Sequence, residues 1–329
     1  MANTVDSAFA EFSRNFVNLD ASKTKKARSS QDWLYTQLNN FPVNDLTFPK
    51  NYENKHIKFG SFARNTKIRE LDDIDLIYCL HADRAYYSTS FADNNLYYIN
   101  TENAGQRLKN LSDDGKLNSK KVINKIVSNL SNIPQYNSAR IHRRQEAATL
   151  NLTSYDWTFD IVPAFYTTAG FYLIPDGNGN WKATNPGLDQ TYVSSINKKH
   201  DFSVHQLVRI LKYWNKKVNK GVVGSYLFEN FVLNFIENQN QLSNYIDINM
   251  INFWQHFQAS VYNEVKDPKG ISSNLNDLSF LDIHKISQRA KEAYEAGLVA
   301  YDLEINENNM EEAVKKWGDI FGLDFPKFN

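Results

Sequence analysis

The chain has 329 residues, of which 42% are hydrophobic and 22% are charged. This is enough apolar material for a core, and it excludes wholesale disorder. Its 37 basic and 37 acidic residues cancel, which argues against a non-specific DNA- or RNA-binding protein. The single cysteine, Cys79, excludes an intramolecular disulfide and a cysteine-cluster metal site.

The first part of the chain mixes helices and strands. Apolar residues spaced three or four apart predict a helix over 5–19 and a second one around 33–38, followed by a loop at Pro42 and Pro49. The apolar run 74–80 predicts a central strand buried on both faces. The strands expected are 56–59, 73–80, 140–144, 148–152 and 157–162, the last one stopped by Pro163, with a hairpin over 171–181.

Residues 81–118 show no period, a helix is expected over 122–130, and from about residue 201 the pattern becomes helical. The helices expected there are 205–218, 226–236, 251–265, 286–298 and 310–321. Strands followed by helices predict an α+β chain of two lobes. We expect the division to be 1–198 and 199–329.

Two carboxylates stand at the start of the central strand. Asp73 and Asp75 are two residues apart, so in a strand they share one face, whereas Asp72 lies on the other. Two neighbouring carboxylates stay ionised when positive charge lies between them, and a divalent cation supplies it. A solvated strand edge is the alternative reading of such a pair.

A third carboxylate and a small turn add to this pair. Asp160 lies in an apolar strand, where an aspartate is costly unless it is hydrogen-bonded or binds a metal. Gly60 and Ser61 follow a strand and would let backbone approach a phosphate closely, although a plain turn would also explain them. The three carboxylates could hold two Mg²⁺ ions for phosphoryl transfer.

The helix over 205–218 places basic residues opposite its apolar face, namely His205, Arg209, Lys212 and Lys216. Either this is a solvated face or some of these cations meet a triphosphate. Ser225 and Tyr226 begin the next helix, whose first N–H groups suit phosphate. Tyr226 could stack on a base or belong to the core, and Glu229 is expected to satisfy a neighbour.

These motifs resemble those of the polymerase-β-like nucleotidyltransferases, and more narrowly of the cGAS/DncV-like nucleotidyltransferases (CD-NTases) of bacterial anti-phage signalling. The resemblance spans about residues 50–329 and leaves 81–118 unmatched. The segments that carry it are Gly60–Thr66, Asp73–Asp75, Phe159–Pro163, Leu211–Trp214, Ser225–Tyr226 and the ending Trp317–Pro326.

The resemblance implies a fold and a set of roles. The fold is a nucleotidyltransferase palm with a mixed sheet plus a C-terminal helical lobe, an N-terminal helix bridging the two, and an active site in the cleft. Asp73, Asp75 and Asp160 would be the catalytic carboxylates that bind two Mg²⁺ ions, with Mn²⁺ as a substitute. The nucleotide-binding residues would be Gly60, Ser61, Lys212, Ser225 and Tyr226.

The expected activity is condensation of nucleoside triphosphates, ATP among them, into a cyclic di- or trinucleotide messenger with release of pyrophosphate. A separate effector would recognise this product in anti-phage defence (CBASS). The alternatives are a nucleotidyltransferase with an RNA end or small molecule as acceptor, and a non-catalytic nucleotide sensor. We expect a cytoplasmic monomer with no signal peptide, no membrane association and no strong nucleic-acid binding. Base choice, linkage and ring size depend on pocket shape.

Overall fold

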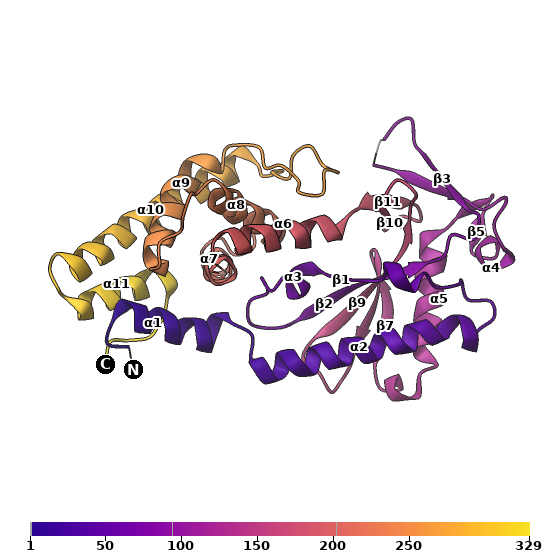
Figure 1. Ribbon diagram of the computed structural model, residues 1–329, viewed down its shortest axis with the longest axis horizontal. Helices are drawn as coiled ribbons and strands as arrows, with labels where there is room; N and C mark the ends of the chain where they lie inside the picture. Colours follow the sequence, from indigo (N-terminus) through magenta and orange to yellow (C-terminus); the bar gives the residue numbers. More distant parts are fainter. Residues whose placement is uncertain (1, 94, 202) are drawn as a thin grey trace. The chain divides into compact units, whose positions relative to one another are not determined.

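The computed structural model describes residues 2–93, 95–201 and 203–329 (Figure 1). The chain divides into two compact units, which we describe separately. The palm unit consists of Ala21–Arg64 and Leu71–Gln190, and the helical unit of Met1–Asp20, Asn65–Glu70 and Thr191–Asn329. The division expected from the sequence gives each lobe one continuous segment, whereas each of these units is assembled from separate segments. Among the described residues, no helix has the length and apolar character needed to cross a membrane.

One mixed sheet organises the palm unit. Its main path contains, in spatial order, β1 (Ile57–Phe59), β2 (Asp73–Leu80), β9 (Thr158–Tyr166), β10 (Tyr172–Pro175), β11 (Trp181–Thr184), β4 (Tyr97–Asn100), β6 (Lys116–Leu117) and β5 (Ser112–Asp113). β3 (Tyr86–Thr89) pairs with β4, while β8 (Ala147–Asn151) joins β9 to β7 (Arg140–Arg144). β2 and β9 are parallel and their other pairings are antiparallel, which confirms the mixed sheet.

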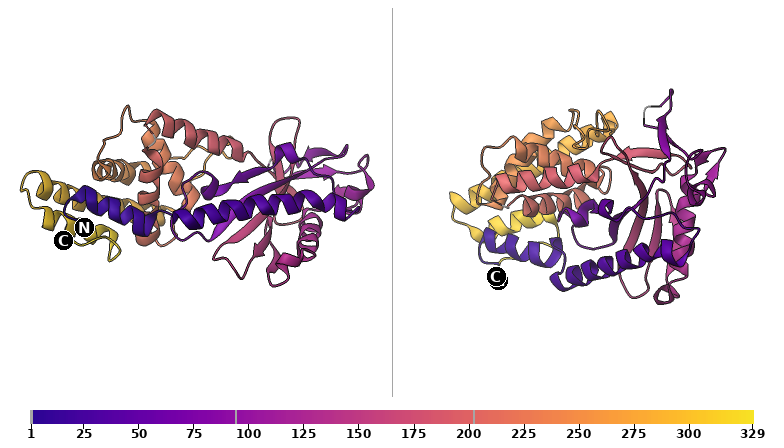
Figure 2. Two further views of the ribbon diagram at one scale, coloured as in Figure 1. Left: turned by 60° about the horizontal axis from the view of Figure 1, so that its bottom comes forward. Right: turned by 45° about the vertical axis from the view of Figure 1, so that its right-hand side comes forward.

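The two faces of β2 differ in chemistry. Ile74, Leu76 and Tyr78 point to one face and are fully buried, whereas Asp73 and Asp75 on the other face are half-buried. The helix α2 (Ala21–Asn44) runs along the sheet in Figure 2, and the Tyr78 hydroxyl donates to its Leu38 carbonyl at 2.8 Å. The α5 helix (Ser119–Ser131) packs against β7 and β8. The Asp-bearing strand is therefore central, as its apolar run predicts.

Pro42 does not begin a loop, because α2 continues through it to Asn44. A proline in a helix lacks the N–H that would bond the carbonyl four residues earlier, which here is Leu38. The Tyr78 hydroxyl donates to that carbonyl instead. The lost backbone bond is thus replaced from the neighbouring sheet, and the prediction of a loop at Pro42 was wrong.

Two other sequence expectations in the palm need correction. Residues 81–118 contain β3, β4, β5, β6 and the short helix α4 (Gln106–Lys109), and strands this short are hard to see as a period. β9 also continues past Pro163 to Tyr166. β8 pairs with β9 as far as Ile161 and β10 pairs from Phe165, so Pro163 falls between these two ladders and breaks neither.

The helical unit is built around aromatic side chains. Its helices are α1 (Val5–Phe12), α7 (Val204–Val218), α8 (Ser225–Glu237), α9 (Ile246–Ser260), α10 (Phe280–Ile305) and α11 (Met310–Phe321), and a π-helical turn (Ser13–Val17) follows α1. The rings of Phe9 and Trp317 meet edge-on with centroids 5.0 Å apart, and Phe12 contacts Phe321 and Phe325. Ala2 pairs with Phe328, so the chain ends lie together (Figure 1).

Most of the expected helices are confirmed here, with shifted ends. The stripe over 5–19 predicts one helix, but the α-helix ends at Phe12 and the π-helical turn leaves Phe16 38% exposed. The helix expected at 251–265 is α9, which starts earlier, at Ile246. The helix α6 (Pro186–Lys199) was not anticipated, because its buried apolar residues, Val193 and Ile196, are too few for a clear stripe. It contains the boundary between Gln190 and Thr191.

Candidate active site

Sheet register brings the three carboxylates to one face of the palm sheet. β2 and β9 run parallel, with Asp75 opposite Asp160 and Asp73 opposite Thr158. Residues in register on adjacent strands point to the same side, and so do residues two apart on one strand. Asp73, Asp75 and Asp160 therefore share a face although 85 residues separate Asp75 from Asp160 along the chain.

All three side chains line one cavity of about 530 Å³. Its other lining residues are Phe59, Asp72, Arg144, Gln145, Glu146, Ala147, Thr158, Val162, Ile174 and Lys182. Asp72 belongs to this lining although strand alternation assigns it to the opposite face. It precedes the first residue of β2 and is therefore not bound by strand alternation. With Asp72 and Glu146, five carboxylates line the cavity.

Gly60 is in close contact with Asp75. It begins the one-turn helix α3 (Gly60–Ala63) with a φ of +76°, a conformation that L side chains rarely adopt. A Cβ at this position would lie 1.9 Å from Asp75 Oδ2. Only glycine leaves room for the carboxylate of Asp75, and Ser61 follows in the same turn, half-buried.

Asp160 has a hydrogen-bond partner on the other side of β9. Thr149 on β8 stands directly opposite Asp160, and its hydroxyl donates to Asp160 Oδ1 at 2.6 Å. Sequence reasoning did not find Thr149, because its relation to Asp160 depends on how β8 pairs with β9. Thr149 is buried and Asp160 is half-buried.

Positive side chains face the same cavity and were also missed. Arg144 and Lys182 line it, and Lys182 Nζ lies 2.7 Å from Glu146 Oε1. Arg144 ends β7, and Gln145 and Glu146 form the turn into β8. The strands 140–144 and 148–152 were expected, but which cavity the turn between them meets depends on how β8 pairs with β9.

The donor set suits a hard divalent cation, since carboxylate oxygens are the ligands that Mg²⁺ and Mn²⁺ prefer. The close contact at Gly60 also keeps one of these carboxylates next to a backbone turn. Within residues 2–93, 95–201 and 203–329, no group of three or more His, Cys, Asp or Glu side chains is placed so that it could hold a metal ion without rearrangement. The three aspartates share a face and a cavity, but their carboxylates do not form a complete coordination site.

The other predicted nucleotide contacts belong to the helical unit. Lys212 on α7 is 4% exposed, and its ammonium lies 2.8 Å from Glu229 Oε2 on α8. The Thr66 hydroxyl donates to the same carboxylate oxygen at 2.8 Å. Lys212 is therefore not on a solvated basic face, because a buried carboxylate pairs with it. The expectation that Glu229 satisfies a neighbour is confirmed.

Ser225 and Tyr226 are the first two residues of α8. Ser225 is exposed and Tyr226 is half-buried. The Lys269 ammonium lies 4.4 Å from the centroid of the Tyr226 ring, a cation–π distance. Tyr226 is thus neither plain core nor fully exposed.

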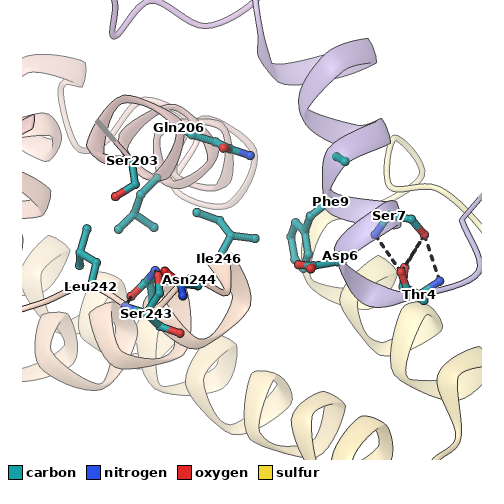
Figure 3. Close-up of a pocket in the computed structure, with 13 residues that line it drawn as sticks. Thr4, Asp6, Ser7, Phe9, Ser203, Gln206, Leu242, Ser243, Asn244 and Ile246 are labelled. Carbon is teal, nitrogen blue, oxygen red and sulfur yellow. Dashed lines mark hydrogen bonds between the residues drawn. The ribbon is translucent and has the colours of Figure 1, made fainter. Parts of the chain in front are cut away.

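A second cavity lies in the helical unit and contains none of the predicted site residues. Its volume is about 510 Å³. In Figure 3, Asp6 and Phe9 of α1 face it from one side, and Leu242 and Ile246 lie on another. The hydrogen bonds drawn there join Thr4 and Ser7, which cap α1.

Comparison with known proteins gives one curated relative and a set of structural neighbours. No protein-family model matches the chain. The chain is 44% identical, over an alignment of 336 positions, to a Bacillus cereus (strain VD146) protein named "Probable cyclic nucleotide synthase", and the alignment covers 99% of each chain. The fold resembles E. coli MS115-1 CdnC in its HORMA-deltaN complex, with a TM-score of 0.72, and the same protein with ATP, with a TM-score of 0.70. Each alignment covers 98% of both chains at 16% identity.

Proposed function

Because the chain belongs to the cGAS/DncV-like nucleotidyltransferases, we propose that it condenses nucleoside triphosphates into a cyclic di- or trinucleotide and releases pyrophosphate. The observation that carries this proposal is the register of β2 and β9, which brings Asp73, Asp75 and Asp160 to one cavity. A relative 44% identical over the full length supports the cyclic product rather than transfer to RNA or to a small molecule.

The carboxylates of Asp73, Asp75 and Asp160 would hold two divalent cations. When bound, such ions favour the deprotonated form of an attacking ribose hydroxyl and neutralise charge on the departing pyrophosphate. The absence of a side chain at Gly60 leaves room for the Asp75 carboxylate, and the Gly60–Ser61 backbone beside it would approach a phosphate closely. Arg144 and Lys182 provide positive charge at the same cavity, where they would attract a second anionic nucleotide.

In the helical unit, Lys212, Ser225 and Tyr226 are proposed nucleotide contacts on the strength of the family motif. Lys212 is held by Glu229, so a triphosphate would have to compete with that carboxylate. Ser225 at the start of α8 offers a hydroxyl and an N–H group, and the ring of Tyr226 offers a face for a base.

The test is to incubate the purified chain with labelled nucleoside triphosphates, singly and in mixtures, with Mg²⁺ or Mn²⁺. We expect pyrophosphate and a phosphatase-resistant product, whose mass gives ring size and base composition. Asp73→Asn, Asp75→Asn and Asp160→Asn should each lower turnover at least about 100-fold, because the transition-state charge loses its counter-ions. Asp156→Asn is the matched control, since that carboxylate is 82% exposed and lies outside the cavity lining.

The same assay separates the alternatives. Label that appears on added RNA or on a small-molecule acceptor would favour a different nucleotidyltransferase. Nucleotide binding without pyrophosphate release from any mixture would favour a non-catalytic sensor. Full activity of Asp75→Asn would contradict the assignment of the carboxylates.

We further propose that the product activates a separate effector in anti-phage defence and that the chain acts as a monomer in the cytoplasm. Phage plating on cells that carry the parent gene in its natural genomic context, compared with cells that carry the Asp75→Asn variant there, tests the first point. Light scattering during size-exclusion chromatography tests the second. Equal plating efficiency for the two strains would remove the defence role without touching the enzymatic proposal.

A further inference from the structure

Asp75 and Asp160 stand opposite each other on adjacent strands, and each is constrained by a neighbour of a different kind. The constraint on Asp75 is steric, because its Oδ2 lies 1.9 Å from the point where a Cβ at Gly60 would be, so the carboxylate packs against that turn. The constraint on Asp160 is a hydrogen bond from Thr149. The second constraint is one that neither the motif nor the resemblance includes.

The contact between Thr149 and Asp160 is short and direct. The two residues are Cα partners in the antiparallel β8–β9 pair, so their side chains lie on the same face of the sheet. The distance of 2.6 Å from Thr149 Oγ1 to Asp160 Oδ1 is in the range of a charge-assisted O–H···O⁻ bond. An ionised carboxylate can only accept, so the threonine hydroxyl is the donor.

The position of Thr149 does not itself call for a hydroxyl. β8 is buried from Ala147 to Leu150, and in this run only Thr149 is polar. Thr149 is 3% exposed, and valine has nearly the same shape and suits a buried strand equally well. A buried hydroxyl is costly without a partner, and Asp160 is the partner that the structure shows.

We propose that Thr149 is a positioning residue for divalent-cation binding. By engaging Oδ1 of Asp160, its hydroxyl fixes the rotamer of that carboxylate and presents Oδ2 to the cation. This inference rests on the proposed function, in which Asp160 is a metal ligand. Partners that orient a ligating group typically change metal affinity or activity by about 10- to 100-fold when they are removed.

The experiment compares Thr149→Val with Thr149→Ser in the full-length chain. Binding of Mn²⁺ alone is followed by the loss of the electron paramagnetic resonance signal of the aqueous ion, which does not require turnover. In Thr149→Val we expect Mn²⁺ affinity to fall by about 10- to 100-fold, and the Mg²⁺ concentration for half-maximal pyrophosphate release to rise in parallel. Thr149→Ser keeps the hydroxyl and should stay close to the parent protein in both measurements.

Thr167→Val is the matched control for stability. Thr167 is also buried in the palm unit, and its hydroxyl donates to a backbone carbonyl, that of Phe171, at 2.9 Å. This variant should lose thermal stability much as Thr149→Val does while its Mn²⁺ affinity stays unchanged. Circular dichroism checks that every variant is folded.

Three results would overturn the inference. Unchanged Mn²⁺ affinity in Thr149→Val would show that the hydroxyl does not serve the cation. Equal losses in Thr149→Ser or in Thr167→Val would point to a general packing effect. Unchanged Mn²⁺ affinity in Asp160→Asn would remove the metal assignment of Asp160 and the inference with it. If instead the Mn²⁺ results hold while no nucleotide mixture gives a product, the proposed function fails and the positioning role stands.

Discussion

Gly60, which directly follows β1, and Asp75, the third residue of β2, constrain each other. The positive φ of Gly60 and the 1.9 Å approach that a Cβ would make to Asp75 Oδ2 are two separate reasons for glycine at this position. The first reason is local to the backbone, whereas the second connects the turn with a proposed metal ligand. A substitution can separate them, because other glycines in the palm unit have only the first.

Gly60→Ala should abolish most nucleotidyltransferase activity, since the new methyl group must displace the Asp75 carboxylate. Gly177→Ala is the control, because Gly177 has a φ of +87° but no heavy atom within 4 Å of the point where a Cβ would lie. Both variants should lose about 1 kcal/mol of unfolding free energy from backbone strain. Urea unfolding and pyrophosphate release are the measurements. Equal activity in the two variants would rule out the contact with Asp75 as the reason for Gly60.

The sequence alone identified site residues where the residue type and its spacing along a strand both point to the same site. Asp73 and Asp75 are two apart in a strand, so their common face follows from strand geometry alone. Thr149, Arg144 and Lys182 could not be placed in this way. Each lies on a strand whose partners are decided by tertiary pairing, and nothing local indicates that the side chain meets the cavity of Asp160.

Among the elements, α7 and α8 are joined by a buried ion pair. Lys212 and Glu229 are 4% and 1% exposed, so removing one partner leaves the other charge without its counter-ion in the core. Lys212→Met should lower the unfolding free energy by about 3–5 kcal/mol. The double variant Lys212→Met/Glu229→Gln should lose clearly less, because no buried charge remains. Chemical denaturation measures both.

Lys217→Met serves as the control, since Lys217 and its partner Asp324 are 52% and 34% exposed and this pair should contribute less than about 1 kcal/mol. If Lys212 also contacts the triphosphate, the KM for nucleoside triphosphate rises in both Lys212 variants, including the more stable double one. A double variant that is as unstable as the single one would contradict the energetic role of the pair.

The helix α2 depends on the sheet for one of its own hydrogen bonds. Tyr78→Phe removes the hydroxyl that contacts both the Leu38 carbonyl and Asn51 Oδ1, and it should cost about 1–3 kcal/mol of unfolding free energy. Burial already raises the pKa of Tyr78, so this hydroxyl stays protonated at any physiological pH. In the Tyr78→Phe background, Pro42→Ala should recover part of the loss, because it returns a backbone N–H to that carbonyl. If the effect of Pro42→Ala on thermal stability is the same with and without Tyr78→Phe, the two sites are independent.

Elements were predicted well where one physical pattern dominates. The apolar run of β2 and the apolar stripes of α5, α7 and α11 gave these elements nearly their observed bounds. Predictions failed where a partner overrides a local rule, as at Pro42, where Tyr78 supplies the missing bond. They also failed at Pro163, which falls between two ladders. The short strands of 81–118 have too few residues to show alternation.

The stability of the molecule should depend on pH through the helical unit. Burial and the nearby Asp247 and Asp6 raise the pKa of Glu304 from 4.5 to about 7. The folded state therefore holds this proton more tightly than the unfolded state does, and stability is lost as pH rises from about 4.5 to about 7. The free energy of unfolding of Glu304→Gln should equal that of the parent protein near pH 4.5. At pH 8 it should be higher by about 1–2 kcal/mol, a value reduced because the side chain is partly exposed.

Thermal unfolding across this pH range measures the effect. Glu292→Gln on the same helix is the control, because that side chain is exposed and its substitution should leave the pH dependence unchanged. The idea fails if Glu304→Gln and the parent protein lose stability in parallel between pH 5 and pH 8.

The segment Asn65–Glu70 belongs to the helical unit although it separates Gly60 from Asp73, which both belong to the palm. The Thr66 hydroxyl and the Asn65 carbonyl tie it to Glu229 and Arg209. The chain consequently passes between the units four times, so no single cut yields two self-sufficient fragments. A chimera with another member of the family must exchange three separate stretches together. A donor lobe taken from residue 191 onward would lack Thr66, whose hydroxyl donates to the buried Glu229.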